Sequence, residues 1–198
     1  MLQEFLGVIA IKVTNLISSL GYWGIFLAMA VESFNVPIPS EIIHPYAGYL
    51  VSTGQFNFLP AILAGALGGL TGSIASYYLG RYLMDSPLLF FISVQRRQWL
   101  IEIFEHYGEG IVFFGRLLPM VRTVISLPAG AARMNIWRFI TYTLAGSLIW
   151  ATLFTYLGYF LGKNWSVLSR YFHEADLVIL LVLGLGLAYW LWRKSKRS

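Results

Sequence analysis

Two arginines lie within an apolar stretch of the chain, Phe113-Phe114-Gly115-Arg116-Leu117-Leu118-Pro119-Met120-Val121-Arg122. A charged side chain at the centre of a bilayer costs about 2.5–3.5 kcal/mol, so an arginine at that depth usually serves a function. Pro119 removes a helical hydrogen bond between the two arginines. Backbone groups freed in this way are tolerated at membrane depth only against protein or a water-filled cavity. The stretch therefore predicts a re-entrant hairpin whose arginines hold an anion, although exposed arginines in a cytoplasmic loop would fit the same residues.

The composition indicates an integral membrane protein with a single domain. Of the 198 residues, 58% are hydrophobic and only 12% are charged. The absence of cysteine excludes disulfides and thiolate sites, and the three histidines are too scattered to form a metal cluster. We therefore expect no metal or other cofactor, with protons as the one candidate coupling ion. The net charge of +5 is divided among the ends of apolar runs, which does not suggest nucleic acid.

The apolar runs predict an all-α membrane protein with about four full transmembrane helices, two re-entrant helical hairpins and an amphipathic surface helix. We expect the full helices at 5–31, 58–83, 136–161 and 176–192, the hairpins at 32–57 and 110–130, the surface helix at 98–109 and a cytoplasmic tail at 193–198. Ala28-Met29-Ala30 is similar to a signal-peptidase site. Because the start of the chain has no basic residue before its apolar core, we expect the first helix to be retained.

The first predicted hairpin contains two carboxylates, Glu32 and Glu41, on either side of Pro37-Ile38-Pro39, which cannot be helical. The span that follows at 58–83 carries small residues at three- and four-residue spacing. Such residues let another backbone approach closely in lipid, which explains them better than a phosphate-binding loop does.

The basic residues predict an orientation. With the basic tail inside and each hairpin returning to its side of entry, nine basic residues fall inside and two outside, as the positive-inside rule requires. The inside set is Arg81, Arg96, Arg97, Arg133, Arg138, Arg193, Lys194, Lys196 and Arg197, and the outside set is Lys163 and Arg170. Both termini are then cytoplasmic.

This orientation makes the two hairpins enter from opposite sides, hairpin 32–57 from outside and hairpin 110–130 from inside. Three short motifs also recur in order: Ala47-Gly48, Ala64-Gly65 and Tyr78-Leu79-Gly80 return as Ala129-Gly130, Ala145-Gly146 and Tyr156-Leu157-Gly158. Such matches are common by chance in apolar chains. Together with the topology they indicate an inverted repeat, the architecture in which transporters hold substrate between broken helices.

Four charges would then converge at the midplane: Glu32 and Glu41 from one hairpin, Arg116 and Arg122 from the other. Without compensation they would cost roughly 10 kcal/mol in total, at about 2.5 kcal/mol each. One interpretation is that two glutamate–arginine pairs close the bundle. The other is that the arginines bind a phosphate by bidentate hydrogen bonds while the glutamates carry protons or compete for the arginines. Both can hold if the pairs form in the empty state.

Other polar residues and prolines are close enough in sequence to line the cavity. These supporting residues are Asn35, Pro37, Pro39, Ser40, His44, Pro119, Thr123 and Ser126. His44 could titrate near neutral pH, but a packed or hydrogen-bonded histidine explains it as well. Five tryptophans lie near predicted span ends or surfaces, where interfacial anchoring explains most of them. They are Trp137, Trp150, Trp165, Trp190 and Trp192.

These motifs resemble the DedA family of membrane proteins, also described as SNARE-associated or VTT-domain proteins, over residues of about 30 to 160. The matching residues are Glu32 followed by Pro37-x-Pro39-Ser40-Glu41; Gly72 through Tyr77 to Gly80-Arg81; Phe113-x-x-Arg116-x-x-Pro119-x-x-Arg122; Ala129-Gly130; and Gly146-x-x-x-Trp150. Ser73 departs from the family pattern, in which aspartate is frequent, and this argues against an ion-coupling role at that position.

The resemblance implies a fold with two opposed re-entrant hairpins in the bacterial cytoplasmic membrane. It also implies movement of polyprenyl phosphate or phospholipid, above all the return of undecaprenyl phosphate, the cell-wall lipid carrier, from the outer to the inner leaflet. A link to the proton motive force is implied as well. By motif position the family's essential acidic pair falls on Glu32 and Glu41, and its essential arginines fall on Arg116 and Arg122.

We therefore expect a lipid-phosphate transporter rather than an enzyme, with membrane lipids as partners and an oligomer as one possible state. Phosphatidylethanolamine is a rival substrate. A membrane phosphatase would need a nucleophile or metal-bound water near the phosphorus, and no histidine or acid-rich cluster stands near the arginine motif. A non-transporting assembly factor is a third class.

Overall fold

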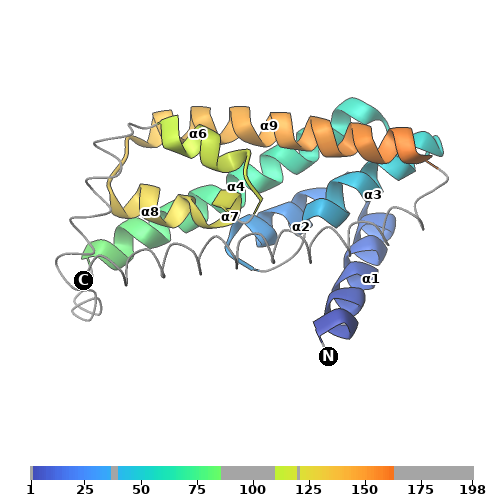
Figure 1. Cartoon of the computed structure of the whole chain (residues 1–198), viewed down its shortest axis with the longest axis horizontal. Coiled ribbons are helices and arrows are strands. Elements are labelled where there is room, and N and C mark those ends of the chain that lie inside the picture. Colours follow the sequence, from blue (N-terminus) through green and yellow to red (C-terminus); the bar gives the residue numbers. More distant parts are fainter. Residues whose placement is uncertain (1, 37–39, 86–109, 120, 163–198) are drawn as a thin grey trace, which may run out of the picture. The chain divides into compact units, whose positions relative to one another are not determined.

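The computed structural model describes residues 2–36, 40–85, 110–119 and 121–162. All regular secondary structure in these ranges is helical, so the prediction of an all-α chain is confirmed for them. The helices are α1 (Leu2–Leu20), α2 (Tyr22–Ser33), α3 (Ser40–Ser52), α4 (Phe58–Asp85), α6 (Gly110–Arg116), α7 (Val121–Val124), α8 (Ser126–Ala131) and α9 (Ile136–Leu161) (Figure 1). The predicted surface helix 98–109, span 176–192 and tail 193–198 lie outside the described residues.

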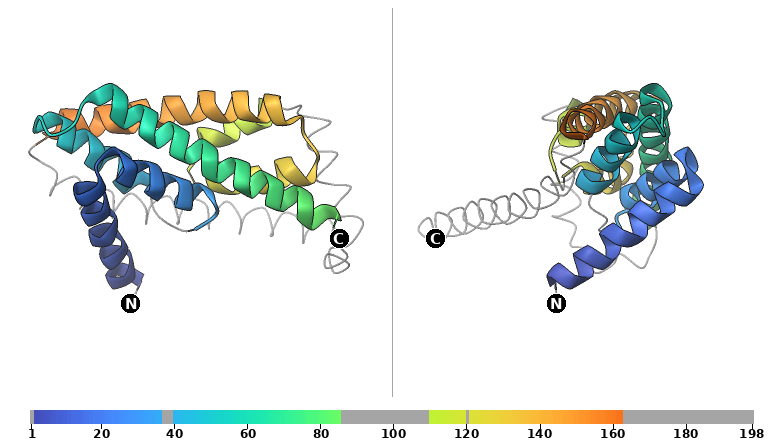
Figure 2. Two further views of the ribbon diagram at one scale, coloured as in Figure 1. Left: turned by 180° about the vertical axis from the view of Figure 1, so that it is seen from behind. Right: turned by 90° about the vertical axis from the view of Figure 1, so that its right-hand side faces the viewer.

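Two long helices, α4 and α9, run antiparallel to each other along the molecule (Figures 1 and 2). Their apolar stretches, Phe58–Leu83 and Ile136–Leu161, hold 26 residues each. At about 1.5 Å per residue each stretch is roughly 39 Å long, which exceeds the roughly 30 Å hydrocarbon core of a bilayer. Both helices are therefore long and apolar enough to cross a membrane, as the sequence predicted for 58–83 and 136–161.

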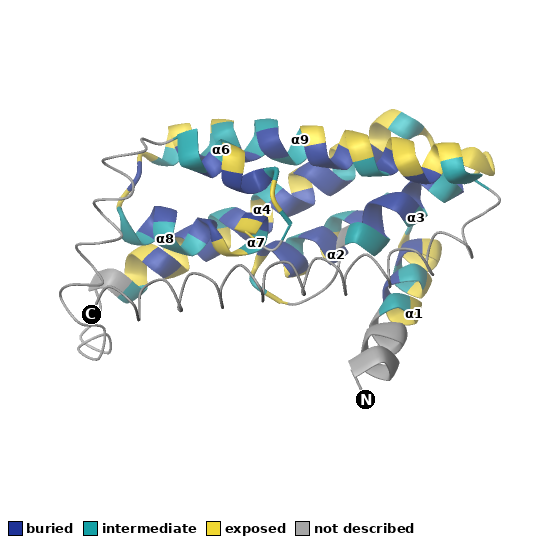
Figure 3. Cartoon of the chain, viewed as in Figure 1, coloured by how far each residue is buried: buried dark blue, intermediate teal, exposed yellow. Residues whose placement is uncertain are grey.

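The outer faces of these helices are exposed and apolar (Figure 3). On α4 the exposed residues recur every four positions, at Leu59, Leu63 and Leu67. On α9 they include Leu153 and Phe160, the latter 76% exposed. Side chains that recur at this spacing lie on one face of a helix. A face of large apolar residues is unfavourable in water and favourable against lipid tails.

The single helix predicted for 5–31 is wrong, because the chain breaks into α1 and α2 at Gly21. Gly21 has a φ angle of 63°, in the left-handed region that residues with a Cβ rarely adopt. The apolar pattern continues through this glycine, so hydropathy alone could not show the break. The predicted hairpin 32–57 begins only in the last turn of α2, so the prediction left most of this helix out of the hairpin. The buried face of α2 packs on α4.

Two helical hairpins approach the middle of the molecule from opposite ends (Figures 1 and 2). In the first, α2 runs inward and α3 returns to the end at which α4 begins. In the second, α6 runs inward and α7 and α8 return to the end at which α9 begins. The helices of the second hairpin are short because Pro119 follows α6 and interrupts the helical path. In each hairpin one arm packs on α4 and the other on α9, and the two hairpins meet where α2 contacts α7.

Reciprocal glycines join α3 to α9. A Cβ at Gly48 would overlap the carbonyl oxygen of Thr155, and a Cβ at Gly158 would overlap the carbonyl oxygen of Pro45. Each glycine therefore lets the backbone of the other helix approach to contact distance, as in other close helix pairs in lipid.

The same arrangement joins α4 to α8. A Cβ at Gly130 would overlap the carbonyl oxygen of Tyr77, and a Cβ at Gly80 would overlap that of Leu127. In both crossings each glycine faces the residue three positions before its partner glycine. The recurrent Ala-Gly and Tyr-Leu-Gly motifs thus occupy matching contacts, and each hairpin packs on the long helix that follows the other hairpin.

The remaining glycines of α4 that contact backbone lie against α2. A Cβ at Gly68 would overlap the carbonyl oxygen of Phe26, and one at Gly72 would overlap that of Ala30. The prediction that these glycines serve helix packing is confirmed.

Candidate anion-binding site

Arg122 lies on α7 and forms a buried ion pair with Glu32 at the end of α2. The distance from Arg122 Nη2 to Glu32 Oε2 is 3.0 Å, and the two side chains are 6% and 3% exposed. Ser33 Oγ donates a second hydrogen bond to the same carboxylate oxygen, also at 3.0 Å. The Arg122 guanidinium carbon lies 4.8 Å from the ring centroid of Trp150 on α9, which is a cation–π distance.

Arg116 ends α6 and is buried against α9. Its Nη2 donates to Ser126 Oγ on α8 at 2.6 Å. A Cβ placed on Gly146 would lie 2.5 Å from the Cβ of Arg116, so the absence of a side chain at Gly146 makes room for the arginine. Ser126, predicted as a supporting residue, thus holds one of the two arginines directly.

The Gly146-x-x-x-Trp150 motif gains a physical reason from these contacts. Residues four apart on a helix lie on one face, so Gly146 and Trp150 present a single surface of α9. Arg116 packs where the side chain is missing, and Arg122 lies over the indole one turn further on.

Three of the four predicted charges therefore lie in the same buried region. Among the described residues, the charged side chains that are buried are Glu32, Arg116 and Arg122. The buried charges comprise two cations and one carboxylate. The guanidinium Nε atoms of both arginines are buried without a hydrogen-bond partner among the described residues. A site of this kind favours an additional anion.

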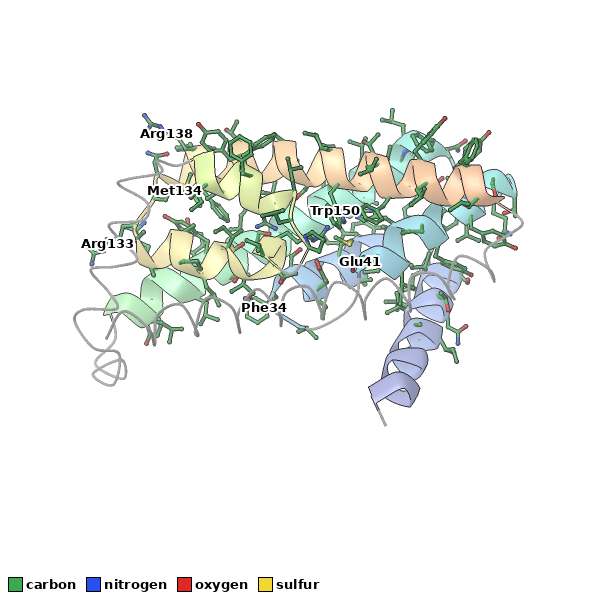
Figure 4. All side chains as sticks on the ribbon, in the orientation of Figure 1. Phe34, Glu41, Arg133, Met134, Arg138 and Trp150 are labelled. Atoms are coloured by element: carbon green, nitrogen blue, oxygen red, sulfur yellow. The ribbon has the colours of Figure 1, made fainter. Side chains whose placement is uncertain are left out.

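The fourth predicted charge, Glu41, lies in the first turn of α3 and is partly exposed. Figure 4 shows Glu41 and Trp150 near the middle of the molecule, at the inner ends of the hairpins. Ser40 begins α3, whereas Pro37 and Pro39 lie outside the described residues.

His44 is fully buried within α3 and packs against α4. A Cβ on Gly65 would overlap the imidazole ring, so the glycine accommodates the histidine. Of the two interpretations of His44, titration near neutral pH or a packed side chain, the contacts fit the packed side chain. Of the other supporting residues, Pro119 lies between α6 and α7, and Thr123 lies on α7 beside Arg122 in sequence.

Two further polar residues hydrogen-bond to residues of α4. Asn35 follows α2 with a φ angle of 67° and donates through Nδ2 to Ser76 Oγ on α4 at 2.6 Å. Ser73, the position at which aspartate is frequent in the DedA pattern, donates its hydroxyl to Gly69 O in its own helix at 2.5 Å. No group of three or more His, Cys, Asp or Glu side chains among the described residues is placed to hold a metal ion.

The interfacial interpretation of Trp150 is wrong. Trp150 is only 5% exposed, whereas Trp137 in the first turn of α9 is 74% exposed and fits an interfacial residue. The Trp150 ring stacks on Phe154 with centroids 4.3 Å apart. In the sequence, only the four-residue spacing between Gly146 and Trp150 indicates that Trp150 lies beside the arginines.

One family model matches the chain, and several known proteins are similar to it in sequence. The model of the VTT domain matches residues 38–160. The chain is 38% identical to the uncharacterized membrane protein YkoX of Bacillus subtilis, over 90% of this chain and 82% of that protein. It is 36% identical to undecaprenyl phosphate transporter A of Bacillus subtilis, over 81% of each chain. An alkaline phosphatase-like protein of Lactococcus lactis is 27% identical over 87% of this chain and 86% of its own length.

No solved structure matches the chain. The family match covers more than half of the chain and includes α3, α4, the second hairpin and nearly all of α9. The residues that form the buried charge cluster on α6 and α7 lie within it. The chain therefore belongs to the VTT-domain, or DedA, family of membrane proteins.

Proposed function

We propose that this protein is a lipid-phosphate transporter that returns undecaprenyl phosphate from the outer to the inner leaflet of the bacterial cytoplasmic membrane. The name of the Bacillus subtilis transporter, at 36% identity, supports this substrate. In the proposal Arg116 and Arg122 bind the phosphate. Phosphatidylethanolamine and other phospholipids are the rival substrates.

One observation carries the proposal: two arginines, 3% and 5% exposed, share a buried region with a single buried carboxylate among the described residues. Arginine presents a planar set of donors that matches phosphate geometry. A cluster built only for stability would be better balanced, since each unpaired buried charge is costly. A phosphate bound between the arginines supplies the missing negative charge.

The two hairpins are re-entrant in this proposal and form an inverted repeat, with both termini cytoplasmic. The matched glycine contacts of the two crossings support the repeat. The orientation is supported by Arg133 and Arg138, which are exposed at the end of the molecule where α9 begins (Figure 4). The turn at 53–57, at the other end, carries no lysine or arginine.

Cysteine labelling tests this orientation, and the chain has no native cysteine to interfere. A cysteine at exposed Gln55 should react with a membrane-impermeant maleimide in intact cells. A cysteine at exposed Asn135 should react only after permeabilisation. Reaction at position 135 in intact cells would contradict the proposed orientation.

The glutamates couple the cycle to protons in the proposal. Glu32 occupies Arg122 in the ion-paired form, so an incoming phosphate must compete with this carboxylate. Protonation of Glu32 would remove its charge and free the arginine for the lipid. Glu41, at the start of α3, is in this proposal the second carboxylate that takes up a proton or competes with the phosphate during the transport cycle.

The Arg116→Lys variant tests the role of the guanidinium. Lysine keeps the charge but loses the planar set of donors, so we expect leaflet-resolved transport of undecaprenyl phosphate in proteoliposomes to fall at least tenfold. The control is Arg138→Lys at an exposed position of α9, which should transport at the wild-type rate. Wild-type transport by Arg116→Lys would show that Arg116 contributes no more than a point charge.

The same proteoliposomes distinguish the other function classes. If the protein transports phosphatidylethanolamine and not undecaprenyl phosphate, the proposed substrate is wrong and the phospholipid takes its place. Release of inorganic phosphate, with a rate that depends on Arg116, would instead establish a phosphatase, the activity suggested by the name of the Lactococcus relative.

A further inference from the structure

The buried polar atoms without a partner among the described residues fall into two chemical groups. Some belong to amide, imidazole or hydroxyl groups, on Asn35, His44, Thr143 and Thr155. The others can only donate: Nε of Arg116, Nε of Arg122 and the indole Nε1 of Trp150. A buried N–H without an acceptor costs about 1–3 kcal/mol, so three donors of this kind need an explanation.

These three donors belong to one small region. Arg122 lies 4.8 Å from the Trp150 ring centroid, and Arg116 packs on Gly146, one helical turn before Trp150 on the same face of α9. The ring faces of Trp150 are engaged by Arg122 and Phe154. The indole N–H points along the ring plane instead, so neither contact satisfies it.

We propose that Trp150 is a third ligand of the anion, donating its indole N–H to the phosphate group that Arg116 and Arg122 also bind. The inference rests on the proposed function and adds a residue to its site. A terminal phosphate has three free oxygens, one for each of the three orphaned donors. The contacts of the Trp150 ring with Arg122 and Phe154 fix its orientation, so the direction of the N–H is set before the lipid binds.

The test removes the N–H while keeping the ring. Trp150→Phe retains an aromatic face for Arg122, and benzothienylalanine at position 150 retains the full bicyclic shape with sulfur in place of N–H. The probes are farnesyl phosphate and its methyl ester, which differ in the number of free phosphate oxygens. Binding is measured by calorimetry on the full chain in detergent, and the control is Trp137→Phe at a 74% exposed position.

We expect wild-type protein and Trp137→Phe to bind farnesyl phosphate more tightly than its methyl ester. Both substitutions at position 150 should weaken binding of farnesyl phosphate about tenfold or more, the usual effect of a hydrogen bond to a charged group. They should also reduce the preference over the methyl ester, which a merely structural role would not alter. The melting temperature of the benzothienylalanine protein should match that of wild type.

Two results would overturn the inference in distinguishable ways. If wild-type protein binds farnesyl phosphate and both position-150 variants bind it with equal affinity and equal preference, Trp150 is not a ligand and the arginine site remains. If wild-type protein binds neither probe, the phosphate site of the proposed function fails together with the inference.

Discussion

Replacing Arg122 with glutamine is expected to destabilise the protein by about 3–5 kcal/mol, the range for removing one partner of a buried ion pair. Glu32 accepts from Arg122 at 3.0 Å and is 3% exposed, so it would be left buried without its cation. The cation–π contact with Trp150 would be lost as well. The measurement is denaturant unfolding in detergent micelles.

The double variant Glu32→Gln/Arg122→Gln separates stability from transport. Removing both charges should restore most of the stability, because no uncompensated charge is left buried and two glutamine amides can hydrogen-bond to each other. Transport should be abolished in both the single and the double variant, since each lacks one of the two arginines that bind the phosphate. The Arg138→Gln control at an exposed site should change stability by no more than about 0.5 kcal/mol. Recovery of transport in the double variant would show that the pair is scaffolding only.

Gly130→Ala is expected to destabilise the protein by about 3 kcal/mol, at the upper end of the range for overpacked sites. The added Cβ would overlap the carbonyl oxygen of Tyr77, which is backbone and cannot rotate away. Helices α4 and α8 would have to separate. Gly48→Ala should cost a similar amount, because its Cβ would overlap the carbonyl oxygen of Thr155 in the matching crossing.

The matched control is Gly69→Ala on α4. Its Cβ would meet only side chains, with Ser33 Oγ at 3.5 Å as the nearest atom. Because alanine favours a helix over glycine by about 1 kcal/mol, this variant should be as stable as wild type or slightly more so. Equal melting temperatures for Gly130→Ala and Gly69→Ala would contradict the proposed close crossing.

The sequence predicted the long helices α4 and α9 because apolar length is a property of the chain alone. It also selected Glu32, Glu41, Arg116 and Arg122, since a charge within an apolar run has an energetic cost wherever the run folds. Of these four side chains, the structure buries all except Glu41, which is partly exposed. The break at Gly21 was not predictable from hydropathy, because a left-handed φ angle leaves the apolar pattern unchanged. The spacing of the glycines on 58–83 predicts helix packing, but it does not identify the helices that they contact.

Which groups pair was decided by the tertiary structure. Glu32 and Arg122 are 90 residues apart in sequence, and nothing in their spacing chooses between Arg116 and Arg122 as the partner. The place of Trp150 was decided in the same way. A tryptophan in an apolar helix suits an interface or an interior equally well, and only the tertiary contact between Arg122 and α9 brings a guanidinium over its ring. The sequence by itself thus determined which residues had to be compensated in lipid, because burial cost depends on residue type. Contacts between distant segments determined what compensates them.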